Sequence, residues 1–198
     1  MADPSFLLLA AGRATRMRGA DKLLEPVPAA FGERPLLEVM ARRCLRAGAT
    51  RVVLGPGQDA RRALLAPLEV EVVDAPEGAG MAASIVAGVT GLTDAVLVVL
   101  ADMPDVTASD LHLLIALSRQ APRAILRAAA QDGTPGHPVL FPADLLGELQ
   151  ALTGDTGARD VLRRHSGRVH LVPLKGRRAL TDLDTPEDWA AWRAGTRT

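Results

Sequence analysis

Short apolar runs alternate with amphipathic stretches along most of this chain. Phe6–Ala10 is apolar throughout, without the alternation of a half-exposed strand, and this is typical of a strand buried on both faces of a parallel sheet. Ala95–Leu100 (AVLVVL) has the same character. Pro35–Ala47 instead places its apolar residues at helical spacing, and Gly48 supplies a C-terminal stop. The pattern therefore predicts strands that alternate with helices.

The remaining predicted elements continue this alternation. A capping box of Thr107 and Asp110 predicts a helix that extends to Leu117, and Asp132–Pro138 (DGTPGHP) is predicted to be a turn or loop. Further strands are predicted at Arg51–Leu54, Val70–Val73, Ala124–Ala129, Val139–Phe141 and Val169–Leu174, and further helices at Asp59–Leu65, Met81–Gly88, Pro142–Leu152, Ala158–His165 and from Thr185 onward. This order predicts an α/β fold: one doubly wound, mostly parallel sheet with helices on both faces, in a single domain that spans residues 1–198.

Composition narrows the classes of function. Lys plus Arg and Asp plus Glu both number 23, so no global field attracts polyanions and any anion site must be local. Aromatic residues make up 3% of the chain, which argues against a nucleic-acid partner. The single cysteine, Cys44, excludes an intrachain disulfide and is interpreted as an inert core thiol. No apolar run has the length of a membrane span, so we expect a cytoplasmic protein without a membrane partner.

Small residues and cations follow the first predicted strand directly. Ala10, Ala11 and Gly12 allow a ligand to approach the backbone, whose N–H groups can then donate hydrogen bonds to it. Arg16 and Lys22 could bind a triphosphate and neutralise charge at the reacting phosphorus. Arg13 and Arg18 are interpreted as peripheral. The alternative is a solvated basic loop without a ligand.

Candidate carboxylates lie far from this loop in the sequence. Asp102 comes directly after Ala95–Leu100, at a strand end where ligands gather in α/β sheets, and could hold Mg²⁺. A helix cap or turn is the alternative for Asp102. Asp182 and Asp184 alternate in LTDLDTPEDW, and either could add a second metal contact or only form a turn before the last helix.

Two glycine-containing segments, GTPGHPVLF and GDTGAR, could form the wall that receives a second substrate; the alternative is that they are simple turns. The chain has no G-x-G-x-x-G after the first strand and no G-x-x-x-x-G-K-[ST], and its four histidines lack zinc spacing. The remaining pattern favours metal-assisted phosphoryl or nucleotidyl chemistry.

Several of these motifs, in this order, resemble those of the MobA-like nucleotidyltransferases. LLAAGRATRM with DKLL is similar to that family's LxAGxSxRMGxxK, and LADMPDV is similar to its LxDMPxV. The resemblance implies a Rossmann-like nucleotidyltransferase fold, with Arg16 and Lys22 on the triphosphate, Asp102 on Mg²⁺ and Asp184 as a second metal ligand. It also implies two binding sets: Leu9, Ala10, Ala11, Gly12, Arg13, Lys22, Gly80 and Ser84 for the nucleotide, and His137, Asp155 and Arg159 for the acceptor.

Within that family the chain looks most like the molybdenum cofactor cytidylyltransferases. Guanylyl-transferring relatives carry glycine where this chain has Ala11, and the added methyl group should narrow the base pocket. The resemblance thus implies transfer of CMP from CTP to the phosphate of molybdopterin, with a molybdoenzyme or its chaperone as a candidate partner. Open alternatives are another nucleotide, a different phosphorylated acceptor, or a non-catalytic protein that presents the cofactor. Arg18 and Ala83 depart from the family's usual glycine and serine.

Overall fold

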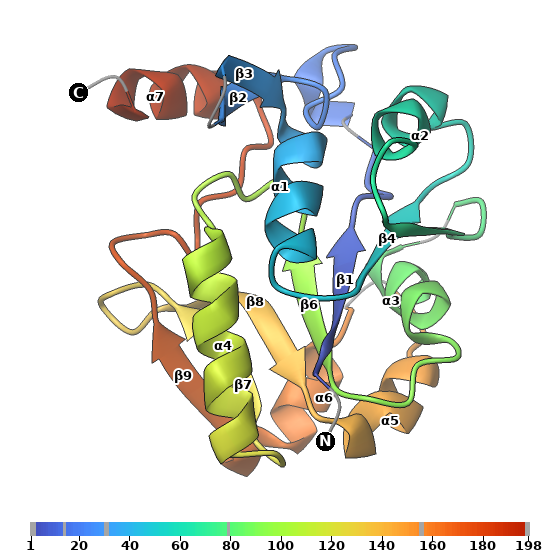
Figure 1. The fold of residues 1–198 in the computed structure, drawn as a ribbon, viewed down its shortest axis with the longest axis vertical. Helices are drawn as coiled ribbons and strands as arrows, with labels where there is room; N and C mark the ends of the chain where they lie inside the picture. The colour runs from blue at the N-terminus through green and yellow to red at the C-terminus, as the bar shows by residue number, and fades with distance from the viewer. Residues whose placement is uncertain (1–2, 14, 30–31, 79, 155–156, 197–198) are drawn as a thin grey trace.

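A seven-stranded sheet forms the centre of the computed structural model, which describes residues 3–13, 15–29, 32–78, 80–154 and 157–196 (Figure 1). The four strands on one side of the sheet are mutually parallel, and β8 then runs antiparallel to both of its neighbours. In spatial order the strands are β5 (Glu71–Asp74), β4 (Thr50–Leu54), β1 (Ser5–Leu9), β6 (Val96–Leu100), β8 (Pro135–Phe141), β7 (Ile125–Ala129) and β9 (Val169–Pro173). The predicted mostly parallel α/β sheet is confirmed.

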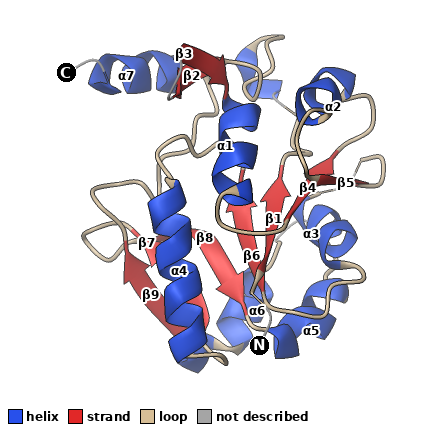
Figure 2. Ribbon diagram, viewed as in Figure 1, coloured by secondary structure: helices blue, strands red, loops and turns tan. Residues whose placement is uncertain are grey.

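Helices cover both faces of this sheet (Figure 2). On one face lie α1 (Leu36–Leu45) and α4 (Ala108–Gln120), with α2 (Asp59–Leu65) packed against α1. On the other face lie α3 (Met81–Val89), α5 (Leu146–Gln150) and α6 (Arg159–Arg164). The chain also forms α7 (Pro186–Thr196) and the 3₁₀ turns Thr15–Met17, Ala143–Leu145 and Ser166–Arg168. None of the helices in the described residues is long and apolar enough to cross a membrane.

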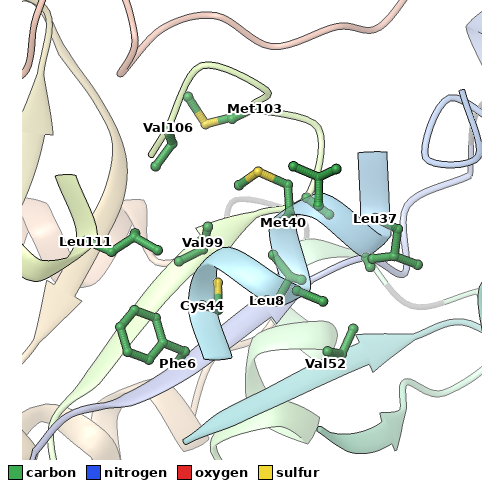
Figure 3. Close-up of a cluster of buried hydrophobic side chains, with 14 of the residues drawn as sticks. Phe6, Leu8, Leu37, Met40, Cys44, Val52, Val99, Met103, Val106 and Leu111 are labelled. Carbon is green, nitrogen blue, oxygen red and sulfur yellow. The ribbon is translucent and has the colours of Figure 1, made fainter. Parts of the chain in front are cut away.

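Strand β1 is buried on both faces, as its uninterrupted apolar run predicts. Phe6 and Leu8 belong to the core on the α1 side, whereas Leu7 belongs to the core on the α3 side. Figure 3 shows the first of these cores, where Cys44 of α1 lies among apolar side chains. Burial raises the pKa of Cys44 to about 12, so its thiol stays protonated at neutral pH. Because β1 is anchored on both sides, the loop that follows it starts from a fixed position.

The prediction of a loop through Pro138 is wrong, because β8 already begins at Pro135. The turn ends earlier: Ala130 N–H donates to Thr134 O at 2.8 Å, and Gly133 adopts a φ of 87°. Prolines weaken the strand signal in the sequence, but pairing with β7 and β6 on either side stabilises β8. The hairpin of β2 (Pro26–Ala29) and β3 (Gly32–Pro35) was also not predicted, for the same reason.

Candidate active site

The loop after β1 borders a cavity of ≈ 310 Å³ at the carboxyl ends of β1 and β6. Two backbone hydrogen bonds fix this edge: Ala10 N–H donates to Val53 O, and Ala101 N–H donates to Leu9 O. Arg13 lies apart from this cavity and borders a neighbouring hollow with Gly55 and Gln58. All the other expected nucleotide-binding residues line the cavity, together with Asp102: Leu9, Ala10, Ala11, Gly12, Lys22, Gly80 and Ser84.

A cluster of ion pairs includes two residues of the cavity wall, Lys22 and Asp102. Lys22 Nζ donates to Asp102 Oδ2 and to Asp184 Oδ1, each at 2.6 Å. Arg16 reaches the other oxygen of Asp184 at 2.7 Å. The side chain of Lys22 is only 11% exposed, and those of Asp102 and Asp184 are 21% and 20% exposed. We call Arg16, Lys22, Asp102 and Asp184 the charge cluster; it brings together residues that are 80 and 162 positions apart.

The two carboxylates keep Lys22 charged in spite of its burial. Burial alone would lower the pKa of Lys22, but attraction to Asp102 and hydrogen bonds to both carboxylates outweigh it, so that the pKa is raised. The pKa of Asp182 is raised by its own burial and by repulsion from Asp184 and Asp102. Of the two aspartates in LTDLD, Asp184 is the one that makes the ion pairs with Lys22 and Arg16. Leu183 N–H donates to Asp102 O at 3.1 Å, which positions this segment.

The oxygen atoms of the charge cluster differ in what they bind. Asp102 Oδ1 is buried and has no hydrogen-bond partner in the described part of the chain, whereas both oxygens of Asp184 accept from cations. The described ranges contain no group of three His, Cys, Asp or Glu side chains that could hold a metal ion. Mg²⁺, however, is usually bound by one or two carboxylates that are supplemented by substrate phosphates. The free oxygen of Asp102 fits that requirement.

Arg61, which was not predicted as a site residue, fixes the loop after β1 through several hydrogen bonds. Its guanidinium is 2% exposed, donates to both oxygens of Asp21 at 2.7 Å, and also donates to Gly12 O at 3.0 Å and to Ala10 O. Nearby, Gln58 donates to Ala11 O. The only signal in the sequence is helical spacing, which puts Arg61 on the same face of α2 as the buried Leu65.

A second cavity, of ≈ 330 Å³, adjoins the first and contains two of the expected acceptor residues. His137 and Arg159 both line it, whereas Asp155 lies outside the described residues. Two residues without a predicted acceptor role, Arg127 and Asp182, also line it. The remaining wall is largely apolar and includes Leu9, Met81, Val98, Leu100, Val139 and Phe141.

His137 is a neutral group in this second cavity. Burial, followed by repulsion from Arg127, lowers its pKa to about 4, although Asp102 opposes the shift. Its Nδ1 is buried without a hydrogen-bond partner in the described residues. Its backbone N–H donates to Ala179 O at 2.9 Å, and a Cβ atom on the preceding Gly136 would lie 1.9 Å from that oxygen. Only glycine permits this close crossing of two backbone segments.

Arg18 lies outside both cavities. It adopts a φ of 52°, a conformation that favours glycine, which explains the family's usual glycine at this position. Its guanidinium pairs with Glu187 at 2.6 Å on the surface.

Comparison with known proteins assigns the chain to a family. Residues 6–169 match the sequence model of the MobA-like NTP transferase domain, so the chain belongs to the MobA-like nucleotidyltransferase family, and the resemblance of the motifs is confirmed. The nicotine blue oxidoreductase of Paenarthrobacter nicotinovorans is 30% identical over 193 residues, which cover 91% of this chain and 92% of that protein.

Solved structures agree with this assignment. Rv0371c from Mycobacterium tuberculosis H37Rv superposes with a TM-score of 0.80 at 28% identity, covering 96% of this chain and 98% of that one. A second structure of Rv0371c is a complex with manganese, with a TM-score of 0.73 at 26% identity and coverage of 96% and 97%. A CMP:2-keto-3-deoxy-manno-octonic acid synthetase in complex with CTP has a TM-score of 0.76 at 12% identity, with 99% of both chains covered, and shows the shared fold alone.

Proposed function

We propose that this chain is a Mg²⁺-dependent nucleotidyltransferase that transfers CMP from CTP to the phosphate of molybdopterin and releases pyrophosphate. The observation that carries the proposal is the charge cluster, whose members Lys22 and Asp102 line the cavity beside the loop after β1. The charge cluster contains two cations that could bind a triphosphate, Arg16 and Lys22. It also contains Asp102, whose Oδ1 has no hydrogen-bond partner in the described residues. Membership of the nucleotidyltransferase family supports the same reading.

In the proposed reaction a phosphate oxygen of the acceptor attacks the α-phosphorus of CTP. The bond from that phosphorus to the oxygen bridging the α- and β-phosphates breaks, and this oxygen leaves with pyrophosphate. The acceptor phosphate is already ionised at neutral pH, so the reaction requires no general base. Catalysis then depends on positioning and on neutralisation of charge, which Lys22 and Arg16 would supply.

Asp102 would hold Mg²⁺ through Oδ1, and Asp184 would be the second ligand once Arg16 had turned to the triphosphate. The bound ion would neutralise negative charge on the phosphates. Lys22 would remain on Asp102 Oδ2 and keep that carboxylate oriented. The backbone N–H groups of Ala11 and Gly12 are the candidate donors to the phosphates, because Arg61 and Gln58 already hold the carbonyl groups of this loop.

Selection of CTP is assigned to Ala11, which lines the nucleotide cavity. A thermal-shift panel of CTP, GTP, ATP and UTP with Mg²⁺ tests this assignment, and we expect selective stabilisation by CTP. Selective stabilisation by GTP would overturn it.

The decisive test is incubation with CTP, Mg²⁺ and purified molybdopterin cofactor, followed by assay of pyrophosphate and of the cytosine dinucleotide. Lys22→Met should lower kcat/KM by about 30- to 1000-fold, the equivalent of about 2–4 kcal/mol of lost electrostatic stabilisation. The chain provides a matched control in its other lysine, Lys175, which is exposed and borders neither of the two cavities. Lys175→Met should turn over like the wild type.

A second candidate function follows from the relative that is named an oxidoreductase. With that function the chain would oxidise or reduce nicotine blue and would release no pyrophosphate. The two candidates are separated by parallel assays of pyrophosphate release from CTP and of nicotine blue absorbance with a reduced nicotinamide nucleotide. A change of absorbance, without a thermal shift by CTP, would favour the oxidoreductase.

A further inference from the structure

The second cavity has an apolar wall with a few polar groups. Leu9, Val98, Val139 and Phe141 contribute to the apolar part. Such a wall suits a ligand with an apolar body, because burial of apolar surface is the main favourable term and a few polar groups fix the orientation. The polar groups of the cavity then decide which charge the ligand carries.

Two guanidinium groups that line this cavity have no acidic partner within the described ranges. Arg127 is half-buried, and its Nε donates to Gly136 O at 3.1 Å, which fixes the base of the guanidinium and leaves its terminal nitrogens available. Arg159, the first residue of α6, is exposed and contributes to the lining of the cavity. Arg127 and Arg159 also repel each other, which, after burial, is the second cause of the lowered pKa of Arg127.

The carboxylate in the lining does not compensate these charges. Asp182 interacts with Asp184, Asp102 and Lys22, which places it with the charge cluster. His137 is neutral at pH 7, so it does not change the net charge of this cavity. Arg127 thus differs from Arg61, whose charge is fully paired by Asp21. Arg127 is half-buried, is repelled by Arg159 and has no counter-ion in the described residues, so its charge would be stabilised by a bound anion.

An anion at this position would lie outside the cavity proposed for the nucleotide phosphates. Among the described residues, the two cavities share three lining residues, Leu9, Met81 and Leu100, all of them apolar. Lys22 and Asp102 line the first cavity, whereas Arg127 and Arg159 line the second. An apolar ridge therefore separates two cationic positions.

We propose that Arg127 and Arg159 form a second anion subsite, which binds a negative group on the apolar body of the acceptor, away from its attacking phosphate. The proposal rests on the proposed function in that the ligand of the second cavity is the acceptor. It narrows the acceptor class to molecules with a ring system that can pack against the apolar wall and at least two anionic groups, one on each side of the Leu9–Met81–Leu100 ridge. Arg127 would supply the fixed contact, since its guanidinium is anchored on Gly136.

The test uses 1-naphthyl phosphate as an anionic apolar probe and 1-naphthol as its neutral counterpart, with binding measured by titration calorimetry. Arg127→Met and Arg159→Met should each lower the affinity for 1-naphthyl phosphate by about tenfold or more, the scale of a lost charge-assisted hydrogen bond. Binding of 1-naphthol should be unchanged in both variants. If wild-type protein does not bind 1-naphthyl phosphate, or if both probes weaken equally, the subsite is overturned.

CTP binding in the same variants separates this proposal from the proposed function. Lys22→Met should weaken the binding of CTP and leave the binding of 1-naphthyl phosphate unchanged. Arg127→Met should weaken the binding of 1-naphthyl phosphate and leave the binding of CTP unchanged. A protein that binds the probe through Arg127 but binds no nucleotide would refute the proposed function and leave the anion subsite standing. Should Arg127→Met fail to fold, Arg159→Met carries the same comparison, because Arg159 is exposed at the start of α6.

Discussion

The two cavities differ in how their polar groups are satisfied. Around the first, charged side chains bind one another: Lys22 with Asp102 and Asp184, and Arg61 with Asp21. Around the second, Arg127 and His137 Nδ1 have no such partner in the described residues. The first cavity is thus preorganised by the protein, whereas the second leaves polar groups for a ligand to satisfy. Changes at the first should damage the protein as well as the reaction, and changes at the second should mainly alter binding.

Among the substitutions at the first cavity, Asp102→Ala should have the largest effect on the reaction. It removes the partner of Lys22 and the carboxylate oxygen proposed for Mg²⁺, so pyrophosphate release should fall by about 10³-fold or more. Pyrophosphate assays at saturating CTP measure this loss. Asp94→Ala, at a partly exposed position that lines neither cavity, is the control. Turnover close to wild type by Asp102→Ala would remove the metal assignment.

Arg61→Met tests whether the loop depends on its internal pairing. The substitution strips two oxygens of Asp21 and two loop carbonyl groups of their donor, and we expect a loss of about 3–5 kcal/mol in the free energy of unfolding. The neighbouring Arg62 pairs with Asp74 on the surface, so Arg62→Met should cost less than about 1 kcal/mol. Urea unfolding of both variants decides the matter, and equal losses would contradict a special role for Arg61.

His137 makes the second cavity sensitive to acid. Because its pKa falls from 6.5 to about 4 on folding, the unfolded chain binds the proton first, and stability is lost as the pH falls from about 6.5 to about 4. The loss attributable to His137 is on the order of 3 kcal/mol. The difference between the urea midpoints at pH 7 and at pH 4.5 should therefore be smaller for His137→Asn than for the wild type. Identical pH dependence in the two proteins would show that His137 is not buried in its neutral form.

The smallest expected effect concerns the ridge between the cavities. Gly157 has a φ of 58°, and a Cβ atom there would lie 2.9 Å from Met81 Sδ. Gly157→Ala should therefore cost about 1–2 kcal/mol in backbone strain and also displace Met81. Gly154 has a φ of 73°, and a Cβ atom there would meet no atom of the described residues within 4 Å, so Gly154→Ala carries the strain alone. If 1-naphthyl phosphate binding changes equally in both variants, Met81 does not set the width of the ridge.

The sequence predicted the first half of the sheet better than the second. Strands such as Phe6–Ala10 and Ala95–Leu100 are buried on both faces, and their apolar runs carry this information locally. Strand β8 depends on pairing with β6 and β7, and its prolines conceal that pairing in the sequence.

The candidate site shows a similar division. Lys22 and Asp102 could be selected from motifs, because Asp102 comes right at the end of one buried strand and Lys22 belongs to the cationic loop that follows another. Asp182 and Asp184 could not be distinguished, because alternation puts both on one face, and only the contact with Lys22 separates them. Arg61 and Arg127 looked like ordinary members of a short helix and a strand, because the groups that they bind become neighbours only in the folded chain.

The long sequence separations within the charge cluster have a consequence for synthesis of the protein. All the described residues that line the first cavity lie at or before Asp102, whereas the second carboxylate of Lys22 comes from Asp184. A nascent chain that ends at residue 183 therefore contains the residues of these walls but lacks one of the two counter-charges of Lys22. The ribosome adds Asp184 only after all of these lining residues, so the charge cluster cannot form in a nascent chain that has not reached Asp184.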